Sequence, residues 1–281
     1  MNNSDVCGVV VLYYPSNRVF EKILTYTDFL DRLYIIDNSD KNPSSIPTSK
    51  FQCYTVLLSS GVNRGIATAL DIALEQALLD GYKWMLTMDQ DGSFEPLALN
   101  HLLECRYKID INETLLISPL HVEKDIVTSY HCQFNEVDFV MTSGNLVYVQ
   151  NAKNIGGYNR KLFIDEVDHE FCFRGKIAGY KIFEVISTYV NHKLGVHFIH
   201  GSKNIRLYPP ARLYYMVRNY FYLQQKYQQV HPEFFRSRTA FLRKFFYQHI
   251  RYSPKRLQCS LMMLKGWYDY KRNLYGPIDD T

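Results

Sequence analysis

The chain has 281 residues, of which 47% are hydrophobic and 21% are charged. This length and composition allow a full hydrophobic core and one large domain with an appendage, and they exclude a disordered protein. No apolar run reaches the length of about eighteen residues that marks a membrane span, and the first residues lack the basic and apolar regions of a secretory signal. We therefore expect a cytoplasmic protein.

The net charge of +4 hides an uneven distribution along the chain. Residues 206–281 contain fourteen Lys and Arg against four Asp and Glu, a net charge of +10, which leaves −6 for residues 1–205. A basic, tyrosine-rich tail suits nucleic acid, an anionic membrane surface or a phosphorylated substrate, and charge alone does not choose among them.

The six cysteines are scattered, and no two of them form a C-x-x-C pair. They are Cys7, Cys53, Cys105, Cys132, Cys172 and Cys259. Most stand beside apolar residues, so we predict buried free thiols rather than zinc ligands or disulfides.

The first half of the chain alternates between short apolar runs and segments with helical spacing of apolar residues. In order, the pattern predicts a strand at 6–14, a helix at 17–30, a strand at 33–36, a loop at 37–50, a strand at 54–58, a helix at 65–79 and a strand at 84–88. Apolar runs of this kind are typical of parallel strands that are covered on both faces. The alternation predicts a doubly wound α/β sheet.

The second half is less regular. Strands are expected at 115–118, 139–142, 146–149 and 183–186, so the sheet is expected to be mixed rather than purely parallel. From residue 209 onward the spacing of apolar and aromatic residues predicts helices.

Polar residues follow three of the predicted elements: Asp37-Asn38, Asn63-Arg64 and Asp89-Gln90-Asp91. In open α/β sheets ligands bind beyond the carboxyl ends of the strands. Asp89 and Asp91 can both hold Mg²⁺ or Mn²⁺ if Gln90 faces the protein, and Gly92 would let a phosphate approach the backbone. The alternative is a solvated turn, since Asp and Gly are common turn residues.

Three further features have both a structural and a functional interpretation. The acidic segment 165–170 opens a predicted helix, so its carboxylates either cap that helix, which the segment alone favours, or supply a general base. His192 follows a predicted strand and either binds a metal or diphosphate or is only hydrogen-bonded. Asn63 precedes a helix and caps it, contacts a phosphate at its amino end, or does both.

Taken together, the order and spacing of these motifs resemble the family 2 glycosyltransferases with a GT-A fold, especially the bacterial rhamnosyltransferase-like branch. The resemblance extends over about residues 6–222. It rests on segments 9–15, 35–39, 63–67, 89–91, 143–145, 156–158, 167–174, 192–195 and 212–219.

The resemblance implies a mixed α/β sheet of the nucleotide-diphospho-sugar transferase type, flanked by helices, with a C-terminal helical extension. The catalytic domain would be residues 1–205, with a nucleotide-sugar half at about 1–118 and an acceptor half at about 119–205, and the basic aromatic extension would be residues 206–281. It also implies a metal-dependent, inverting transfer of a sugar, best matched by L-rhamnose from dTDP-L-rhamnose, to a glycan acceptor in O-antigen, capsule or cell-wall polysaccharide synthesis.

The resemblance also assigns individual residues. Asp168 would be the catalytic base. The substrate would be bound by Asp37, Asn63, Arg64, Asp89, Gly144, Asn145, Arg212 and Arg218, and Mg²⁺ or Mn²⁺ by Asp89, Asp91 and His192.

Partners and alternatives follow from the same features. The basic helices suit the inner face of a membrane and a polyprenyl-diphosphate-linked acceptor, although a solvated basic helix explains them equally well. A sugar-phosphate nucleotidyltransferase is the main alternative enzyme, but the Gly-rich basic loop that it needs after the first strand is missing from 13–18. A nucleic-acid-binding module is supported only by the tail, so we expect no nucleic acid partner.

Overall fold

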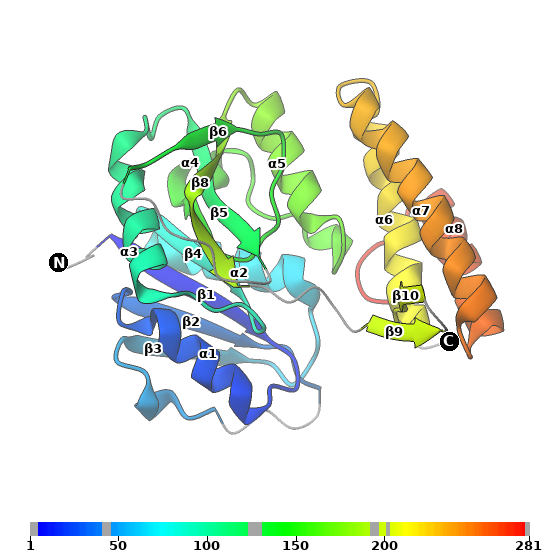
Figure 1. The fold of residues 1–281 in the computed structure, drawn as a ribbon, viewed down its shortest axis with the longest axis horizontal. Helices are drawn as coiled ribbons and strands as arrows, with labels where there is room; N and C mark the ends of the chain where they lie inside the picture. The colour runs from blue at the N-terminus through cyan, green and yellow to red at the C-terminus, as the bar shows by residue number, and fades with distance from the viewer. Residues whose placement is uncertain (1–4, 41–45, 123–130, 192–196, 201–202, 279–281) are drawn as a thin grey trace. The chain divides into compact units, whose positions relative to one another are not determined.

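The computed structural model describes residues 5–40, 46–122, 131–191, 197–200 and 203–278 (Figure 1). Its first half contains the strands β1 (Val6–Leu12), β2 (Arg32–Asp37), β3 (Tyr54–Ser59) and β4 (Trp84–Asp89), with the helices α1 (Asn17–Thr27), α2 (Gly65–Leu79) and α3 (Pro96–Cys105) between or after them. Each predicted strand and helix of this half is present, with ends that differ by a few residues.

The second half contains more elements than predicted. They are β5 (Thr114–Val122), β6 (Phe134–Glu136), β7 (Asn145–Tyr148), α4 (Val149–Asn154), α5 (Val167–Ile177), β8 (Lys181–Asn191), β9 (His197–His200), β10 (Lys203–Arg206), α6 (Pro210–Tyr227), α7 (Pro232–Tyr252) and α8 (Arg256–Lys271). Three 3-10 turns complete the set: η1 (Thr48–Lys50), η2 (Arg106–Lys108) and η3 (Arg160–Leu162).

The strand predicted at 139–142 is wrong. These residues lie in an irregular segment between β6 and β7. Their apolar character has another cause, because the ring of Phe139 packs edge-on against Phe173 of α5, with the ring centroids 6.3 Å apart. Here a short apolar run reflects side-chain packing rather than a β-strand.

Among the described residues, eight strands form one sheet in the order β3-β2-β1-β4-β7-β5-β8-β6. Strands β1 to β4 are parallel, whereas β7 is antiparallel to both of its neighbours and β6 is antiparallel to β8. The predicted mixed sheet is confirmed. Because β1 to β4 run in the same direction, their carboxyl ends share one edge of the sheet.

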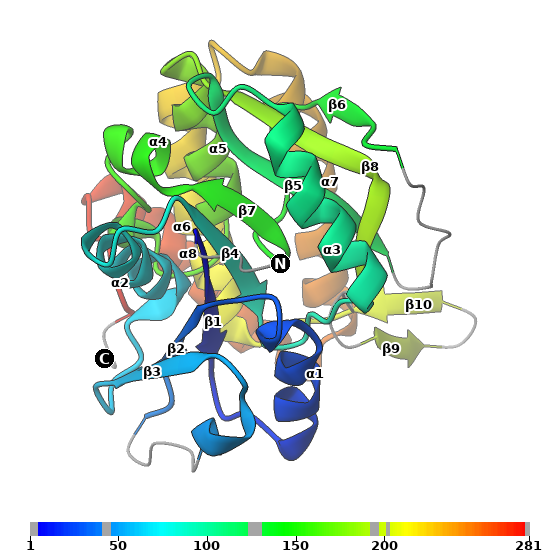
Figure 2. The same ribbon diagram turned by 90° about the vertical axis from the view of Figure 1, so that its left-hand side faces the viewer.

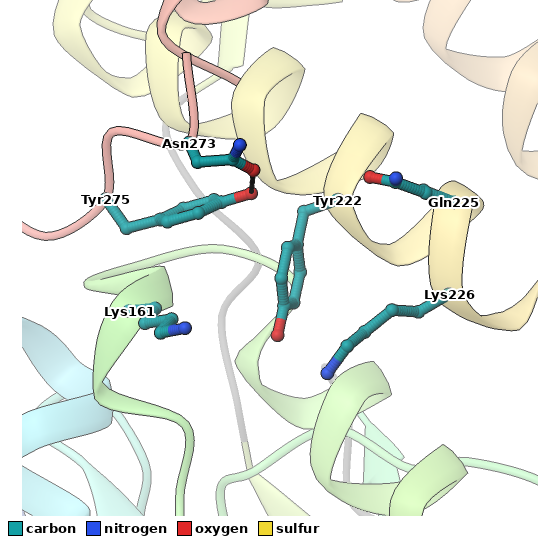
Figure 3. A pocket seen from close by; sticks show the side chains of 6 residues that line it. All are labelled: Lys161, Tyr222, Gln225, Lys226, Asn273 and Tyr275. Carbon is teal, nitrogen blue, oxygen red and sulfur yellow. Dashed lines mark hydrogen bonds between the residues drawn. The ribbon is translucent and has the colours of Figure 1, made fainter. Parts of the chain in front are cut away.

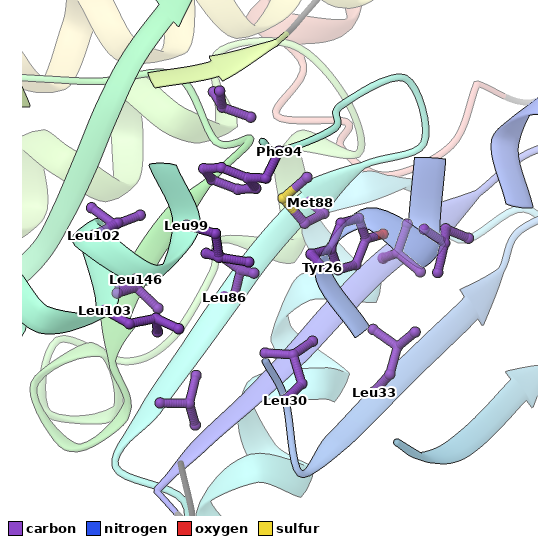
Figure 4. Close-up of a cluster of buried hydrophobic side chains, with 14 of the residues drawn as sticks. Tyr26, Leu30, Leu33, Leu86, Met88, Phe94, Leu99, Leu102, Leu103 and Leu146 are labelled. Carbon is purple, nitrogen blue, oxygen red and sulfur yellow. The ribbon is translucent and has the colours of Figure 1, made fainter. Parts of the chain in front are cut away.

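The sheet has one hydrophobic face beneath α1 and α3, and α2 covers β1, β2 and β4 on the other side (Figure 2). Alternate strand residues such as Leu33, Leu86 and Met88 reach the first face, where Tyr26 and Leu99 from the two helices meet them (Figure 4). Successive strand residues point to opposite faces of the sheet, and helices cover both faces. Both sets of alternate residues are therefore apolar, which explains the continuous apolar runs in the sequence.

The chain divides into two compact units. The first consists of Met1–Asn159 and Phe171–Lys193, and the second of Arg160–Glu170 and Leu194–Thr281. In the second unit α8 packs along α6, and Gly266 makes this possible because a Cβ there would lie 2.4 Å from the Tyr214 carbonyl oxygen. The boundary predicted at residues 205 and 206 stays a prediction. Residues 160–170, which include the acidic segment 165–170, belong to the same unit as the C-terminal helices.

The prediction that all six cysteines are free thiols is wrong for one pair. Cys105, at the end of α3, and Cys132, just before β6, form a disulfide, while Cys7, Cys53, Cys172 and Cys259 remain thiols. The two partners are 27 residues apart and meet only in the folded sheet, so the spacing gave no signal. No helix in the described part of the chain is long and apolar enough to cross a membrane.

Candidate active site

The polar residues predicted at strand ends do share one edge of the sheet in the first unit. Asp37 ends β2 beside Leu12 of β1, and Asp89 ends β4 beside Val11 on the other side of the same strand. Two strand spacings therefore separate their backbones, a distance of about 10 Å. This is the edge at which open α/β sheets bind nucleotides.

A cavity of about 280 Å³ lies at the end of β2 and β3, and it is lined in part by Asp37, Asn38, Ser60 and Arg64. Its volume lies just below the roughly 300–1,000 Å³ of pockets for drug-sized ligands, so it suits a part of a ligand such as a nucleobase. Asp37 is only 1% exposed, and its Oδ1 accepts the N–H of Ser39 at 2.9 Å. The carboxylate is thus fixed by the turn that follows its own strand.

The segment before α2 shows a structural role for Asn63. Its Oδ1 accepts the N–H of Gly65 at 2.9 Å, so the side chain satisfies one of the first amides of the helix. Its own N–H donates to Oδ1 of Asp40 at 2.8 Å. Arg64 lines the cavity and donates through Nε to Oγ of Ser60 at 3.1 Å. A nucleotide contact by Asn63 stays a prediction.

In the triplet Asp89-Gln90-Asp91 at the end of β4, Gln90 turns toward the protein, because its Oε1 accepts the N–H of Tyr13 at 2.9 Å. Asp89 and Asp91 flank it and are both half-buried. The N–H of Gly92 donates to the carbonyl oxygen of Asp89 at 3.1 Å, and a Cβ at this glycine would lie 2.7 Å from Oγ of Ser143. The backbone turn is therefore closed between Asp89 and Gly92, and Gln90 faces the protein, as metal binding by both carboxylates requires.

The fit of a divalent cation rests on this pair. Mg²⁺ is usually held by one or two carboxylates together with substrate phosphates, so Asp89 and Asp91 form a sufficient protein donor set. Within the described residues they belong to no cluster of three or more His, Cys, Asp or Glu side chains, and the one such cluster, His101 with the disulfide pair, has no free thiolate to offer.

His192, the third predicted metal ligand, lies outside the described residues. The residue before it, Asn191, forms an antiparallel bridge with Ser93, two positions after Asp91. The N–H of Ser93 donates to the Asn191 carbonyl at 3.0 Å, and the N–H of Asn191 returns a bond of 2.9 Å. These two hydrogen bonds therefore hold the end of β8 next to the segment that follows Asp91.

The segment Ser143-Gly144-Asn145 lies at the same strand end. Ser143 is fully buried, and its Oγ accepts the N–H of Asp89 at 3.2 Å. Gly144 has φ +86°, a conformation that favours glycine, and its N–H donates to the Thr87 carbonyl at 2.6 Å. Oδ1 of Asn145 is buried without a hydrogen-bond partner among the described residues. A buried amide oxygen of this kind suits a ligand hydroxyl or an ordered water.

The second unit holds the acidic segment, and its first two carboxylates are paired with arginines. Both Nε and Nη2 of Arg212 donate to Asp165, the shortest contact being 2.9 Å. Nε of Arg238 donates to Oε1 of Glu166 at 3.0 Å, and Nδ1 of His169 lies 2.7 Å from Oε2 of the same carboxylate. Asp165 and Glu166 therefore bind side chains rather than capping α5.

These contacts change the pKa values in the segment. Burial alone would raise the pKa of Glu166, but the charges and hydrogen bonds of His169 and Arg238 together lower it to about 2. Burial opposes protonation of His169, whereas Asp168 and Glu166 outweigh this effect and raise its pKa. Burial raises the pKa of Asp165, although Arg212 acts against it.

Asp168 is the carboxylate of this segment that best reaches solvent. Its side chain is 26% exposed, compared with 12% for Asp165 and 1% for Glu166. Glu170 is buried and accepts the hydroxyl of Tyr227 at 3.0 Å. Oδ1 of Asp168 accepts the N–H of His169 at 2.9 Å and lies 3.6 Å from Nδ1 of the same histidine. Asp168 is thus paired as well, but its side chain is the most accessible to a ligand.

The two arginines predicted to bind substrate differ in exposure. The side chain of Arg212 is 40% exposed beside Asp165. Arg218 is fully buried and donates to the carbonyl oxygens of Lys161, Leu162 and Gly276. It therefore links α6 to η3 and to the turn after α8 within the second unit. Their roles toward substrate stay predictions.

Sequence reasoning missed four residues that support these sites. Nζ of Lys22 donates to the carbonyl oxygen of Asp91, Nε2 of His121 lies 2.6 Å from the carbonyl oxygen of Ser143, and Arg238 and His169 hold Glu166. His169 stands inside the acidic segment, which was a usable signal. The other three are far from their partners along the chain and carry no motif.

Comparisons with known proteins agree with the predicted family resemblance. A dTDP-rhamnosyl transferase RfbF of Shigella flexneri is 24% identical over 244 residues, which cover 80% of this chain and 81% of that protein. A scan against protein-family models finds no match.

Two solved structures share the fold. The structure of residues 1–349 of S. aureus TarS in complex with UDP-GlcNAc aligns with a TM-score of 0.58 at 13% identity, over 96% of this chain and 81% of that one. GalNAc-T7 with UDP, GalNAc and Mn²⁺ also aligns with a TM-score of 0.58 at 13% identity, over 89% of this chain and only 58% of that one. The predicted GT-A fold and the resemblance to glycosyltransferases are thereby confirmed.

Proposed function

We propose that this protein is an inverting glycosyltransferase that uses a nucleoside diphosphate sugar, best matched by dTDP-L-rhamnose, and transfers the sugar to a glycan acceptor. The observation that carries this proposal is the arrangement at the sheet edge. The cavity beside Asp37 accommodates a base, and the Asp89 and Asp91 carboxylates stand about two strand spacings away, a distance a nucleoside diphosphate can bridge. The name of the Shigella flexneri relative favours rhamnose as the sugar.

On the donor side we assign separate roles to the residues. Asp37 and Arg64 would contact the nucleoside, while Asp89 and Asp91 would hold Mg²⁺ or Mn²⁺ on the diphosphate. Such a cation, when bound, neutralises the charge that develops on the departing diphosphate. Mn²⁺ in the GalNAc-T7 structure supports a divalent metal. Asn145, with its unsatisfied Oδ1, would accept a hydroxyl group of the substrate.

On the acceptor side Asp168 is the proposed catalytic base. Its carboxylate would take the proton of the acceptor hydroxyl while that oxygen bonds to the anomeric carbon and the bond from this carbon to the diphosphate oxygen breaks. A single displacement inverts the configuration and requires no covalent enzyme intermediate. The exposure of the Asp168 side chain, 26% compared with 1% for Glu166, supports this role.

The acceptor and the location are part of the same proposal. The excess of +10 in residues 206–281 suits a polyprenyl-diphosphate-linked acceptor at the inner face of the cell membrane, in the synthesis of O-antigen, capsule or cell-wall polysaccharide. Exposed basic residues of α7 such as Arg236 and Lys244 would face the anionic surface.

Calorimetric titration with dTDP-L-rhamnose, UDP-GlcNAc and dTTP, with Mn²⁺ or with EDTA, tests the donor site. We expect Mn²⁺-dependent binding of the nucleotide sugar by the wild type and a loss of at least tenfold in affinity for Asp91→Ala, while Glu95→Gln, an exposed neighbour, binds normally. Absence of binding to every nucleotide sugar in both conditions would contradict the proposal. Formation of a nucleotide sugar from dTTP and a sugar phosphate would instead identify a nucleotidyltransferase.

Transfer of radiolabelled sugar to the glycolipid fraction of bacterial membranes tests the base. Asp168→Asn should bind donor normally and lose roughly 10²–10⁴-fold in transfer rate. Normal transfer by this variant would remove Asp168 from the mechanism.

A further inference from the structure

Two groups of polar side chains lie outside the proposed transfer site, one in each compact unit. In the second unit, Lys161 and Lys226 line a pocket of about 740 Å³, and their ammonium groups lie on opposite sides of the Tyr222 hydroxyl (Figure 3). They therefore do not meet around one position that a ligand group could occupy. In the first unit, by contrast, nitrogen and sulfur atoms do meet, between α3 and β8.

This meeting point is formed by His101, Cys105 and Cys132. One ring nitrogen of His101 and the two Sγ atoms all lie within 4.8 Å of one another. His101 and Cys105 stand four residues apart on α3, so they share one face of the helix. Cys132 approaches them from the segment just before β6. The three side chains thus come from two distant parts of the chain and converge only in the folded sheet.

The fold holds the segment before β6 beside β8 and α3 through bonds other than the disulfide. The N–H of Ile186 donates to the Gln133 carbonyl oxygen at 3.0 Å, and the N–H of Gln133 donates to Oγ of Ser187 at 3.3 Å. Oγ1 of Thr188 donates to the carbonyl oxygen of Ala98 at 2.7 Å, which links β8 to α3. Reduction of the disulfide would therefore leave its two thiols next to each other.

The orientation of His101 suits a metal ligand. Its Nε2 lies 3.6 Å from Sγ of Cys105 and 3.0 Å from Oγ of Ser187, so this nitrogen faces the sulfur atoms. Tetrahedral Zn²⁺, with Zn–S bonds of about 2.3 Å and Zn–N bonds of about 2.0–2.1 Å, places its ligand atoms roughly 3.5–3.8 Å apart. The separation of Nε2 and Sγ already matches this spacing. His101 is 6% exposed and Cys105 is fully buried, so bulk water would compete little for the metal.

The donor set also separates this group from the carboxylates at the sheet edge. Thiolate and imidazole ligands favour Zn²⁺ and similar soft cations, whereas the carboxylate oxygens of Asp89 and Asp91 favour Mg²⁺ and Mn²⁺. In the cytoplasm, the location proposed above, thiols are kept reduced, and the disulfides that do form there usually act as redox sensors. Both the reduced and the oxidised state of the cysteine pair are then relevant.

We propose that His101, Cys105 and Cys132 form a redox-controlled binding site for one Zn²⁺ or similar soft divalent cation. In the oxidised protein the disulfide leaves no thiolate to bind a metal. A dithiol reductant breaks the S–S bond and is itself oxidised to a disulfide, which leaves two protonated thiols on the protein. Zn²⁺ then replaces the two thiol protons, which pass to the buffer, and a water completes four ligands. The site uses neither Asp89, Asp91 nor Asp168, so it goes beyond the proposed function.

Titration of the full chain with Co²⁺, followed by ultraviolet absorption, tests the site. Co²⁺ accepts the same ligands as Zn²⁺, and its bond to a thiolate gives a charge-transfer band that a bond to a carboxylate does not give. The protein is first stripped with EDTA and then either reduced with a phosphine or oxidised with glutathione disulfide. In the reduced protein we expect a band that saturates at one equivalent, is removed by Zn²⁺ and is unaffected by excess Mg²⁺. The oxidised protein should give no such band.

Variants assign the ligands. Cys132→Ser should lose the saturating band, and His101→Gln, which keeps a polar group for Ser187, should bind Co²⁺ at least about tenfold more weakly. Cys53→Ser removes a half-buried thiol elsewhere in the first unit and should behave as the wild type does. Circular dichroism shows whether each variant is folded.

The reduced wild type decides the outcome even if a variant fails to fold. Absence of a charge-transfer band in the reduced wild type, or an unchanged band in folded Cys132→Ser, would overturn the metal site. Unchanged affinity in folded His101→Gln would remove His101 from it. A band of equal strength in the oxidised protein would overturn the redox control.

Discussion

Replacing Glu166 by glutamine should destabilise the second unit strongly and in a pH-dependent way. Its folded-state pKa of about 2, against 4.5 when free, corresponds to about 3 kcal/mol at 1.36 kcal/mol per unit. This is close to the roughly 3–5 kcal/mol lost when one partner of a buried ion pair is removed, because Arg238 and His169, which are only 22% and 13% exposed, would lose the carboxylate that they share.

The pH dependence follows from two opposite shifts. A carboxylate with a lowered pKa contributes stability above pH 4.5, and this contribution is lost as the pH falls toward 2. A histidine with a raised pKa contributes stability below pH 6.5, and this contribution is lost as the pH rises through its folded-state value. The difference between wild type and Glu166→Gln should therefore be largest between pH 4.5 and 6.5 and should shrink on either side.

Urea unfolding followed by circular dichroism, from pH 3 to pH 9, measures this difference. Glu233→Gln, which removes an exposed acid of α7, is the matched control and should change the free energy of unfolding by less than about 1 kcal/mol. A loss for Glu166→Gln no larger than that of the control, or one that does not vary with pH, would refute the electrostatic explanation.

Two further predictions concern the first unit. Gly157→Ala should lower the free energy of unfolding by more than about 2 kcal/mol in thermal melts, since its Cβ would lie 2.1 Å from Oδ1 of Asp71 at φ +68°. Gly179→Ala, at φ +90° with open space around it, should lose only the roughly 1–2 kcal/mol of backbone strain, and equal losses would contradict the packing argument. Thiol titration of unreduced protein in guanidinium should detect four thiols, rising to six after reduction, whereas six from the start would contradict the Cys105–Cys132 disulfide.

The parts of the fold that could be predicted are those that depend on local patterns of apolar and polar residues. Strands β1 and β4 are apolar at nearly every position because helices cover both faces, and β4 ends at Asp89, where the edge of the sheet meets solvent. The position of Asp89, Gln90 and Asp91 at the end of an apolar strand likewise suggested a metal site on the condition that Gln90 faces the protein, and the structure meets this condition. These features depend on residues within a few positions of one another.

The parts that were not predictable depend on distant partners. Arg238 follows Glu166 by 72 residues, and neither carries a motif that names the other. The segment at 139–142 is apolar because Phe139 packs on Phe173, a contact that mimics a strand in the sequence. The acidic segment 165–170 can be recognised in the sequence. Only the folded structure shows that Asp168 is more exposed than Asp165 and Glu166.

The division into two units leads to a last prediction, that donor binding is insensitive to changes in the acidic segment. The proposed donor ligands Asp37, Arg64, Asp89 and Asp91 all belong to the first unit, whereas Asp168 and its neighbours up to Glu170 belong to the second. In calorimetry with Mn²⁺, Asp168→Asn should bind the nucleotide sugar with the wild-type dissociation constant, within about twofold, although transfer is lost. A tenfold weaker affinity, or about 1.4 kcal/mol, would show that the second unit takes part in donor binding and would contradict this division of roles.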